Sequence, residues 1–423
     1  MLSYLPRCIP FWIQNRSVAL LHGYLALVIR GLTSLATGPE DVPTPAEHGL
    51  PYEDLTLDTP DGVKIKSYLL VQRRSLPGDN SLDKETEEDG AEEDRKFAGT
   101  RPTILMFHGN AGNIGHRVPL ARIFFIKMRC NVILVSYRGY GQSEGSPSEQ
   151  GFKVDSQTVL DFVRSDPVLK TTPIICYGQS IGGAVSISLA ARNPKEIHAL
   201  VLENTFLSVP RLIPSAIPWL APFSWLCHQK WDSANDVLKI PRTIPILFLS
   251  GVQDEIVPHE HMVTMWNIAI GKMNPDGSPS SSSGTRSDLQ RKEGEEGVTK
   301  DDPAAIQDKG SRGPATSASP SSLPRKSTTT TPWNMQEAAI DKELDTDLDS
   351  DTDGDTREEV EYGIVNDQRV VVSKRTKYRI WREFEKGTHN DTCVQPGYWA
   401  AIWEFINSLV PLPADHFTTS SSS

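Results

Sequence analysis

The sequence predicts an α/β fold, in which helices cover both faces of a mostly parallel central sheet. Short apolar runs typical of buried strands alternate with longer segments that have helical spacing. This alternation indicates a parallel sheet, because parallel neighbours need a crossover connection, which is usually a helix. The expected order is strand 103–108, helix 114–128, strand 131–137, helix 149–164, strand 173–178, helix 181–191 and strand 199–203.

Two further strands are expected before this alternation begins. Residues 55–59 and 63–71 flank Pro60-Asp61-Gly62, a turn signal that predicts a β-hairpin. Residues 75–100 follow, and they hold nine acidic and three basic residues but few apolar ones. Because such a segment cannot bury much apolar surface, we expect a mobile acidic loop there.

The segment 205–240 interrupts the strand–helix alternation and predicts a short helical cap. Four prolines are spaced through a run rich in leucine, isoleucine and aromatic residues. One interpretation is an apolar lid that binds an acyl group and touches lipid. The other is a small cap that buries its aromatic side chains on the core. The sequence leaves both interpretations open.

The segment 272–376 differs in composition from the rest of the chain. It contains serine and threonine runs and alternating acidic residues, with too few apolar residues to offset the entropy lost on folding. We expect a long disordered low-complexity insertion before the last strand. The insertion would divide one domain into residues 50–271 and 377–412, and residues 413–423 would form a disordered tail.

The formal net charge of −11 is concentrated in two segments. Residues 75–100 carry −6 and residues 341–361 carry −9, so the remaining residues together carry +4. A basic stripe with interleaved aromatic residues is absent from the sequence, which argues against nucleic-acid binding. The five cysteines show neither a disulfide framework nor metal-ligand spacing, so we expect no metal and no cofactor.

The stretch Gly178-Gln179-Ser180-Ile181-Gly182 is the strongest chemical signal in the chain. It has the pattern G-x-S-x-G, follows an apolar strand and opens a helix of small residues. That context predicts a nucleophile elbow, a strained turn that exposes the serine hydroxyl above the sheet. A glycine-rich turn after strand 103–108 would supply one amide of an oxyanion hole, assigned to Asn110, and Ile181 would supply the other. His108 is interpreted as a structural residue of that turn.

Two further residues complete the expected catalytic triad. Asp254 ends the apolar run that begins at Pro245, although an aspartate there could also cap the next helix. His389 lies on a loop after a plausible last strand at 378–384, whereas His259 and His261 are expected to belong to the helix after Asp254. In this arrangement His389 takes the Ser180 proton, Asp254 orients the imidazole, and water later resolves the acyl-enzyme.

Four signatures resemble those of the α/β-hydrolase superfamily, and in particular those of the fungal Bem-type hydrolases and their animal ABHD relatives. The resemblance covers about 52–271 and 377–410 and implies a membrane-attached serine hydrolase. Some such relatives are acyl-protein thioesterases with an N-terminal cysteine cluster, where this chain has only Cys8; others carry a peptidase label. The signatures are His108-Gly109-Asn110-Ala111-Gly112-Asn113, Tyr137-Arg138-Gly139-Tyr140-Gly141-Gln142-Ser143, Gly178-Gln179-Ser180-Ile181-Gly182-Gly183 and Gly387-Thr388-His389-Asn390-Asp391-Thr392.

Residues 1–45 predict an N-terminal membrane anchor and linker. The uncharged run 17–29 is shorter than the roughly 20 residues of a spanning helix, but Arg30 can snorkel and extend it. An amphipathic helix is the alternative. The expected location is the endoplasmic reticulum or plasma membrane. The positive-inside rule places the domain in the lumen, whereas unpaired cysteines and a glycosylation sequon at Asn390 argue against that side, so topology stays open.

Together these features predict a membrane-associated serine hydrolase, an esterase or thioesterase. It would cleave ester or thioester bonds of apolar acyl substrates, either lipid esters or acylated proteins such as palmitoyl-proteins. The alternatives are a non-catalytic membrane scaffold of the same fold and a serine peptidase, which would need a carboxylate for the substrate's amino terminus. The expected partners are the acyl substrate, membrane lipid at the N-terminus and protein partners of the acidic insertion. We expect a monomer.

Overall fold

The computed structural model divides the chain into two units, residues 281–339 and all the rest. The unit 281–339 lies outside the described residues, as do the predicted anchor up to residue 41 and the predicted tail at 413–423. The residues that the structure describes are 42–76, 87–216, 218–280, 343–345, 358–365 and 368–410.

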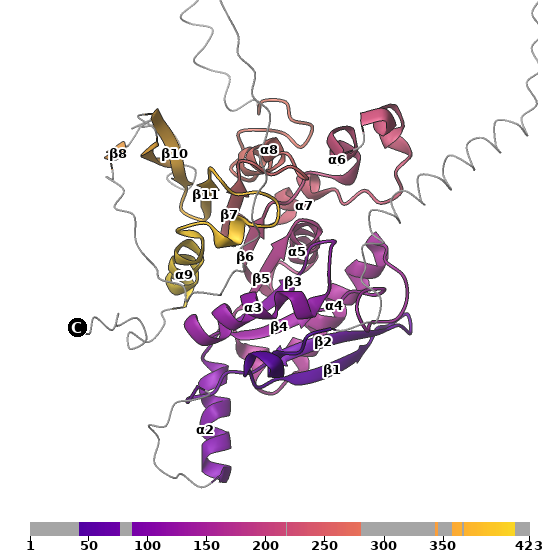
Figure 1. The fold of residues 1–423 in the computed structure, drawn as a ribbon, viewed down its shortest axis with the longest axis vertical. Helices are drawn as coiled ribbons and strands as arrows, with labels where there is room; N and C mark the ends of the chain where they lie inside the picture. The colour runs from indigo at the N-terminus through magenta and orange to yellow at the C-terminus, as the bar shows by residue number, and fades with distance from the viewer. Residues whose placement is uncertain are drawn as a thin grey trace, which may run out of the picture. The chain divides into compact units, whose positions relative to one another are not determined.

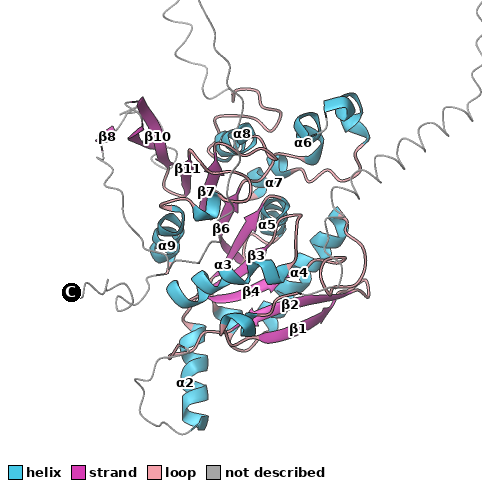
Figure 2. Cartoon of the chain, viewed as in Figure 1, coloured by secondary structure: helices cyan, strands magenta, loops and turns pink. Residues whose placement is uncertain are grey.

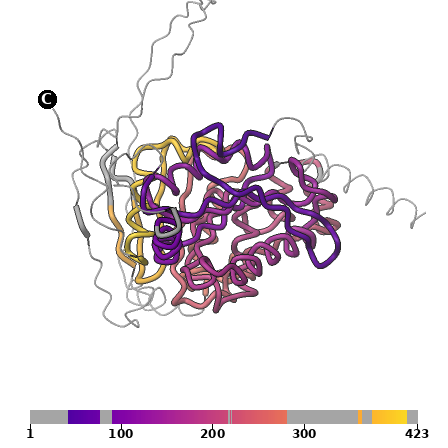
Figure 3. The backbone as a smooth tube through the Cα atoms, turned by 90° about the horizontal axis from the view of Figure 1, so that it is seen from below, coloured from indigo at the N-terminus to yellow at the C-terminus, as the bar shows by residue number. Residues whose placement is uncertain are grey.

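In the described part of the chain, eleven strands form one sheet (Figure 1). Its six central strands run parallel, in the spatial order β4 (Asn131–Val135), β3 (Thr103–Phe107), β5 (Ile174–Gln179), β6 (Ile197–Glu203), β7 (Ile246–Gly251) and β11 (Arg379–Phe384). Antiparallel strands extend both ends: β2 (Lys64–Leu70) and β1 (Glu53–Asp58) beside β4, and β10 (Gln368–Arg375), β9 (Glu359–Val365) and β8 (Glu343–Asp345) beside β11. The indigo and yellow segments therefore lie toward opposite ends of the sheet (Figure 3).

Helices cover both faces of this sheet, as the sequence predicts (Figure 2). Alternate residues of β5 separate two apolar cores, because successive side chains of a strand point to opposite faces. Ile174 and Cys176 join the core of one face, and Ile175 and Tyr177 join the other. The first face carries α4 (Glu149–Ser165), α5 (Ile181–Arg192), α7 (Ser233–Lys239) and α8 (His259–Ala269), and the second carries α3 (Val118–Arg122) and α9 (Tyr398–Leu409).

Shorter helical segments complete the description. The predicted helix 114–128 is divided into a 3₁₀ turn, the α-helix α3 and a π-helical turn. The cap after β6 contains α6 and a 3₁₀ helix, and it is helical as expected. The bounds are η1 (Pro45–His48), η2 (Ile114–Arg117), the π turn η3 (Ile123–Lys127), η4 (Leu169–Thr171), α6 (Val209–Ala216), η5 (Pro218–Leu226) and η7 (Thr392–Val394).

The predicted mobile loop at 75–100 is wrong in its second half, because α2 (Glu87–Gly99) is a helix. Its thirteen residues include four glutamates, two alanines, one lysine and one arginine, which have high helix propensity, together with two aspartates and two glycines, which do not. Near its end, Phe97 lies under the guanidinium of Arg129, at 4.9 Å from the ring centroid, and Ala98 is fully buried. Helix propensity and this small contact therefore stabilise a helix that the acidic composition of residues 75–100 does not indicate.

The predicted insertion 272–376 is also too wide. Residues 272–280 are described, and β9 and β10 pair as an antiparallel ladder that continues the sheet beyond β11. The physical reason lies in the sequence Val370-Val371-Val372 and its neighbours, because β-branched residues favour a pleated strand. Residues 343–345 form β8, so the predicted disorder is wrong there as well, while residues 281–342, 346–357 and 366–367 lie outside the described residues.

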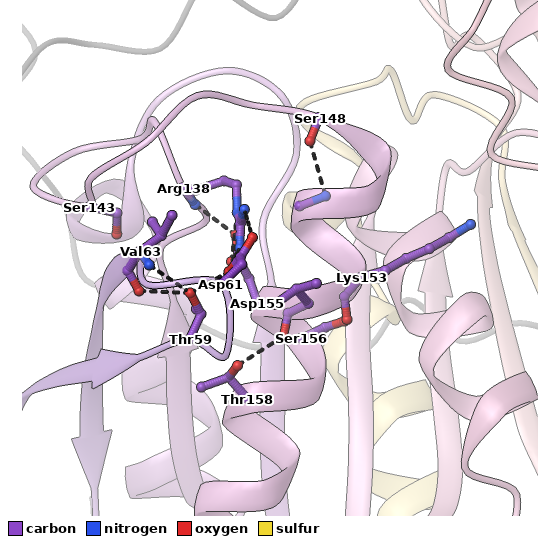
Figure 4. Close-up of polar contacts among 12 residues, drawn as sticks. Thr59, Asp61, Val63, Arg138, Ser143, Ser148, Lys153, Asp155, Ser156 and Thr158 are labelled. Carbon is purple, nitrogen blue, oxygen red and sulfur yellow. Dashed lines mark hydrogen bonds and ion pairs between the residues drawn. The ribbon is translucent and has the colours of Figure 1, made fainter.

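A buried ion network fixes the loop after β4 (Figure 4). The Arg138 guanidinium binds Asp61 of the hairpin turn, with nitrogen–oxygen distances of 2.6 and 3.0 Å. It also reaches Asp155 of α4, whose carboxylate accepts from Nε at 2.9 Å and from the Arg138 amide at 2.8 Å. Burial raises the pKa of Asp155, and the hydrogen bonds from Arg138 oppose that rise. The hairpin, the loop and α4 are thus joined at one residue.

Candidate active site

All five predicted site residues lie where the six parallel strands end, a side of the sheet that we call the carboxyl edge. Ser180 follows β5 directly, Asp254 follows β7, and His389 follows β11. Asn110 follows β3, and Ile181 is the first residue of α5. Ligand sites of open parallel sheets occur at this edge, because the loops after the strands converge there.

Ser180 occupies a strained backbone conformation, with φ of 55° and ψ of −120°. The neighbouring segments hold it there: its amide donates to Glu203 O at 2.9 Å, and its carbonyl accepts from Thr205 Oγ1 at 2.8 Å. A non-glycine residue in such a region costs about 1–3 kcal/mol and persists only when its surroundings impose it. The turn therefore has the strain expected of a nucleophile elbow.

The two glycines of the motif are required by close backbone approaches. A Cβ at Gly178 would lie 2.2 Å from Gly182 O, and a Cβ at Gly182 would lie 1.9 Å from Phe107 O at the end of β3. No larger residue fits either position without moving the backbone. The pattern of the motif thus follows from packing α5 directly against β3 and β5.

The structure brings Asp254 and His389 together across 135 residues of sequence. His389 Nδ1 lies 2.8 Å from Asp254 Oδ2, and both side chains are almost fully buried, at 7% and 1% exposure. Because a carboxylate oxygen accepts, Nδ1 is the donor of this bond, and in the neutral imidazole the lone pair is then on Nε2. The geometry therefore leaves His389 able to accept a proton at Nε2.

The two oxygens of Asp254 have different partners. The helix-cap alternative is wrong, because Pro258 is the N-cap of α8 and no side-chain hydrogen bond caps that helix; the catalytic role of Asp254 stays a prediction. Oδ1 accepts from the amides of Ile256 at 2.9 Å and Val257 at 2.8 Å, while Oδ2 accepts from His389. These bonds fix the carboxylate in place. Ser180 Oγ makes no hydrogen bond to His389 within the described residues, and such bonds are often long in the absence of substrate.

The competing histidines have other partners. His259 Nδ1 lies 2.9 Å from Ser250 Oγ, and His261 Nδ1 accepts from the Leu207 amide at 3.2 Å. Both belong to α8, as the sequence predicts. His108 is buried against Tyr137 and donates from Nδ1 to Gly109 O, and burial lowers its pKa to about 3. A permanently neutral, packed imidazole agrees with the structural role predicted for His108.

The expected oxyanion donors come from two segments: the start of α5, and the turn after β3, where a Cβ on Gly109 would lie 3.7 Å from Ser180 Cβ. The Ile181 amide is at the first position of α5, where helix geometry leaves amides without intrahelical acceptors and the helix dipole is positive. In the second segment, Asn110 Oδ1 accepts from Tyr140 OH at 2.6 Å. That bond joins the glycine-rich turn after β3 to the loop after β4, and so explains why both loops carry signatures. The donor role of Asn110 stays a prediction.

Sequence reasoning missed the residues that hold the His389 loop. Gln179 Nε2 donates to His389 O at 3.0 Å. Asn204, with a positive φ of 45°, donates from Nδ2 to Thr392 Oγ1 at 3.0 Å and to the carbonyls of Thr388 at 3.2 Å and His389 at 3.4 Å. Its Oδ1 accepts from the Gly251 amide at 2.8 Å. One buried amide thus joins the ends of β6, β7 and β11.

A second buried polar group lies beside this amide. Glu203 Oε2 accepts from Tyr177 OH at 2.5 Å and from Tyr398 OH at 2.6 Å, which ties the end of β6 to β5 and α9. Burial raises the pKa of Glu203, and the two tyrosine hydrogen bonds oppose that rise. The available signal was the polar run Glu203-Asn204-Thr205 directly after an apolar strand.

Comparison with known proteins identifies the family. The family model described as Serine aminopeptidase, S33 (Hydrolase_4) matches residues 98–243, which include Ser180 but end before Asp254 and His389. Protein bem46 of Schizosaccharomyces pombe is 44% identical over 230 residues, which cover 54% of this chain and 69% of that protein. The chain belongs to the Bem46-type α/β-hydrolases.

Two further relatives agree with this assignment. The α/β hydrolase domain-containing protein WAV2 of Arabidopsis thaliana is 34% identical, over 61% of this chain and 83% of that protein. The uncharacterized membrane protein YNL320W of Saccharomyces cerevisiae is 36% identical, over 58% of this chain and 78% of that protein. Among the residues that the structure describes, none of the helices is long and apolar enough to cross a membrane. Membership of this family supports a hydrolase.

Proposed function

We propose that the chain is a membrane-associated serine hydrolase that cleaves ester or thioester bonds of apolar acyl substrates. The observation that carries this proposal is the buried hydrogen bond of 2.8 Å between His389 Nδ1 and Asp254 Oδ2, on the same edge as the strained Ser180. A non-catalytic scaffold has no need for a buried imidazole–carboxylate pair, which is costly to desolvate. The pair therefore favours an enzyme.

The proposed reaction uses the residues in the order of their geometry. His389 Nε2 takes the Ser180 hydroxyl proton while Oγ attacks the acyl carbon, and the oxyanion is bound by the amides of Asn110 and Ile181. His389 then gives that proton to the leaving alcohol or thiol, which departs. Water, deprotonated by His389, attacks the acyl-enzyme and releases the acid and Ser180.

Membrane association is supported by two separate observations. The run 17–29 is uncharged and apolar, and the yeast relative YNL320W is named a membrane protein. The cap favours acyl groups as substrates, because its sequence is rich in apolar residues and has no acidic residue between 205 and 231. Lipid esters and acylated proteins, palmitoylated ones among them, both present such groups at a membrane.

A peptidase is the second candidate, favoured by the description of the matching family model. An aminopeptidase must bind the substrate's terminal ammonium, which requires a carboxylate near the cap. Residues 205–231 contain no aspartate or glutamate, and Asp232 is occupied as the cap of α7. Among the acids near the pair, Glu255 accepts from the His389 amide. The charges of the cap therefore favour a neutral acyl substrate.

The test is a substrate panel offered to the purified full-length protein in detergent. It contains p-nitrophenyl esters of increasing acyl length, a palmitoyl thioester and an aminoacyl p-nitroanilide. We expect ester and thioester hydrolysis that increases with acyl length, and loss of it in Ser180→Ala but not in Ser165→Ala, an exposed serine of α4. Hydrolysis of the anilide alone would favour the peptidase, and no turnover of any substrate would favour the scaffold.

A further inference from the structure

The cap exposes large aromatic side chains to solvent. Trp225 is 70% exposed, Trp219 62% and Phe223 39%, and all three belong to η5. The same cap is fixed to the core, because Trp231 is buried and the centroid of its ring lies 6.2 Å from that of Phe152 in α4. The outer side of the cap is therefore apolar surface on a segment fixed to the core, and such surface marks an interaction site.

Other exposed apolar residues lie toward the same side of the sheet. Among the described residues, Ile256 and Val394 are the further exposed large apolar side chains on the carboxyl edge, at 45% and 48%. Ile256 follows β7, which is the neighbour of β6, the strand that leads into the cap. Val394 follows β11, the next strand beyond β7. The apolar surface of the cap and the loops of Asp254 and His389 thus share one edge.

The charge of the cap suits an anionic surface. Residues 205–231 have no acidic residue but hold Arg211 and Lys230, and the whole cap 205–240, which adds Asp232, Asp236 and Lys239, has a net charge of +1 in a chain of net charge −11. Exposed tryptophans combined with basic residues are typical of protein surfaces that lie in the headgroup region of a bilayer. An acidic protein partner would meet the same two cations but would not need two exposed indole rings.

The chain enters the domain at the carboxyl edge. Val42 is the first described residue, and its Cγ2 would lie 3.5 Å from a Cβ placed on Gly141 in the loop after β4. Pro43 packs against Gly115, in the segment after β3, so closely that a Cβ there would lie 2.5 Å from its ring. Residues 1–41, which hold the predicted anchor, therefore join the domain on the same side as the cap.

From these observations we propose that the carboxyl edge docks against the surface of a lipid bilayer, with the aromatic side chains of η5 in the headgroup region. The proposal rests on the proposed function for its biological sense, since a docked site would take acyl groups directly from the bilayer. It does not require catalysis for its test. The short link to residues 1–41 would hold the edge toward the membrane, and the cap would fix its orientation.

The orientation can be measured with a label at a single position of the full-length chain. The five native cysteines are first replaced by alanine. In that background Trp225→Cys carries an environment-sensitive nitrobenzoxadiazole group, and Leu238→Cys is the matched control, 52% exposed on α7, which leads to the amino end of β7. The protein is reconstituted into phosphatidylcholine–phosphatidylserine vesicles with brominated acyl chains. We expect a blue shift and bromine quenching at position 225 and neither at position 238.

Other results would overturn the proposal. Equal spectra at the two positions would mean that the carboxyl edge does not face lipid. A blue shift at 225 without bromine quenching would mean that protein, either a second copy or a partner, covers the cap. Because no turnover is needed, this result stands even if the substrate panel shows no hydrolysis, so failure of docking and failure of the proposed function are distinguishable.

The functional consequence has its own control. In the double variant Trp219→Ser/Trp225→Ser, hydrolysis of a soluble short-chain ester should be unchanged, while hydrolysis of a long-chain ester embedded in vesicles should fall about tenfold. Leu238→Ser should leave both rates unchanged. An equal loss on both substrates would show that the tryptophans shape the site rather than dock it.

Discussion

Asn204→Asp should disable the active site without touching a reacting atom. The substitution keeps the size of the side chain, tolerates the same positive φ and retains an oxygen for the Gly251 amide. It replaces the Nδ2 donor by an oxygen that faces Thr392 Oγ1 and the carbonyls of Thr388 and His389, at 3.0, 3.2 and 3.4 Å. The loop that carries His389 would therefore lose its attachment to β6.

The magnitude follows from the number of bonds. Each lost hydrogen bond is worth about 1 kcal/mol, and a buried acceptor left without a donor costs about 1–3 kcal/mol. With three acceptors around one nitrogen, we expect the free energy of unfolding to fall by about 2–4 kcal/mol. Because a misplacement of about 1 Å can cost a factor of about 10² in rate, kcat should fall by about 10–100-fold while KM changes little.

The assay pairs ester hydrolysis with urea unfolding at mildly alkaline pH, where the introduced carboxyl is ionised. The control is Asn193→Asp at the far end of α5, which also removes a donor, to Gln157 Oε1 at 2.9 Å and Leu189 O at 3.0 Å, but not one near His389. It should lower stability and leave kcat unchanged. Wild-type kcat in a folded Asn204→Asp protein, or an equal kcat loss in Asn193→Asp, would refute the reasoning.

Three further predictions concern the rest of the domain. Arg138→Met leaves Asp155 buried without its cation, so the free energy of unfolding should fall by about 3–5 kcal/mol. Adding Asp155→Leu should restore much of that loss. If a urea titration shows no recovery in the double variant, the ion network does not have the proposed role. Burial lowers the pKa of His108 from 6.5 to about 3, so the unfolded chain binds a proton before the folded chain does, and the free energy of unfolding falls as the pH drops below 6.5. Between neutral pH and about pH 5, the free energy of unfolding of His108→Gln should therefore fall by about 2 kcal/mol less than that of the wild type. Equal losses in the two proteins would exclude this source of acid sensitivity. When residues 281–342 are replaced by a Gly/Ser linker of about 30 residues, the rate of ester hydrolysis should stay within a few-fold of the wild-type rate, because loop closure entropy changes slowly with length. Loss of activity in a variant that still folds would assign the segment a role in the site.

The main parts of the site could be predicted because each has a local signal. Ser180 lies in a motif whose glycines are dictated by the close approach of α5 to β5 and to the end of the neighbouring β3. Asp254 and His389 each follow an apolar strand, and strands that run parallel deliver their ends to one edge. Chain order then selected His389 over the histidines of α8.

The supporting residues could not be predicted, because their partners are distant in sequence. Asn204 bonds to residues 184–188 positions away, and Glu203 to a tyrosine 195 positions away. Composition averaged over the long segments 75–100 and 272–376 also gave the wrong structure for parts of them. The helix α2 is acidic but holds four glutamates, which are good helix formers, and β9 and β10 are short segments with β-branched residues beside a serine-rich and acidic segment.

The central claim is that Ser180 is a nucleophile activated by the His389–Asp254 pair. The most direct measurement treats the full-length protein with a fluorophosphonate and maps the adduct by peptide mass spectrometry, in wild type and in His389→Gln. We predict one adduct, on Ser180, formed at least about 10³-fold more slowly in His389→Gln, which should unfold at an unchanged temperature. An adduct on another residue, or labelling of Ser180 at the wild-type rate without His389, would contradict the account.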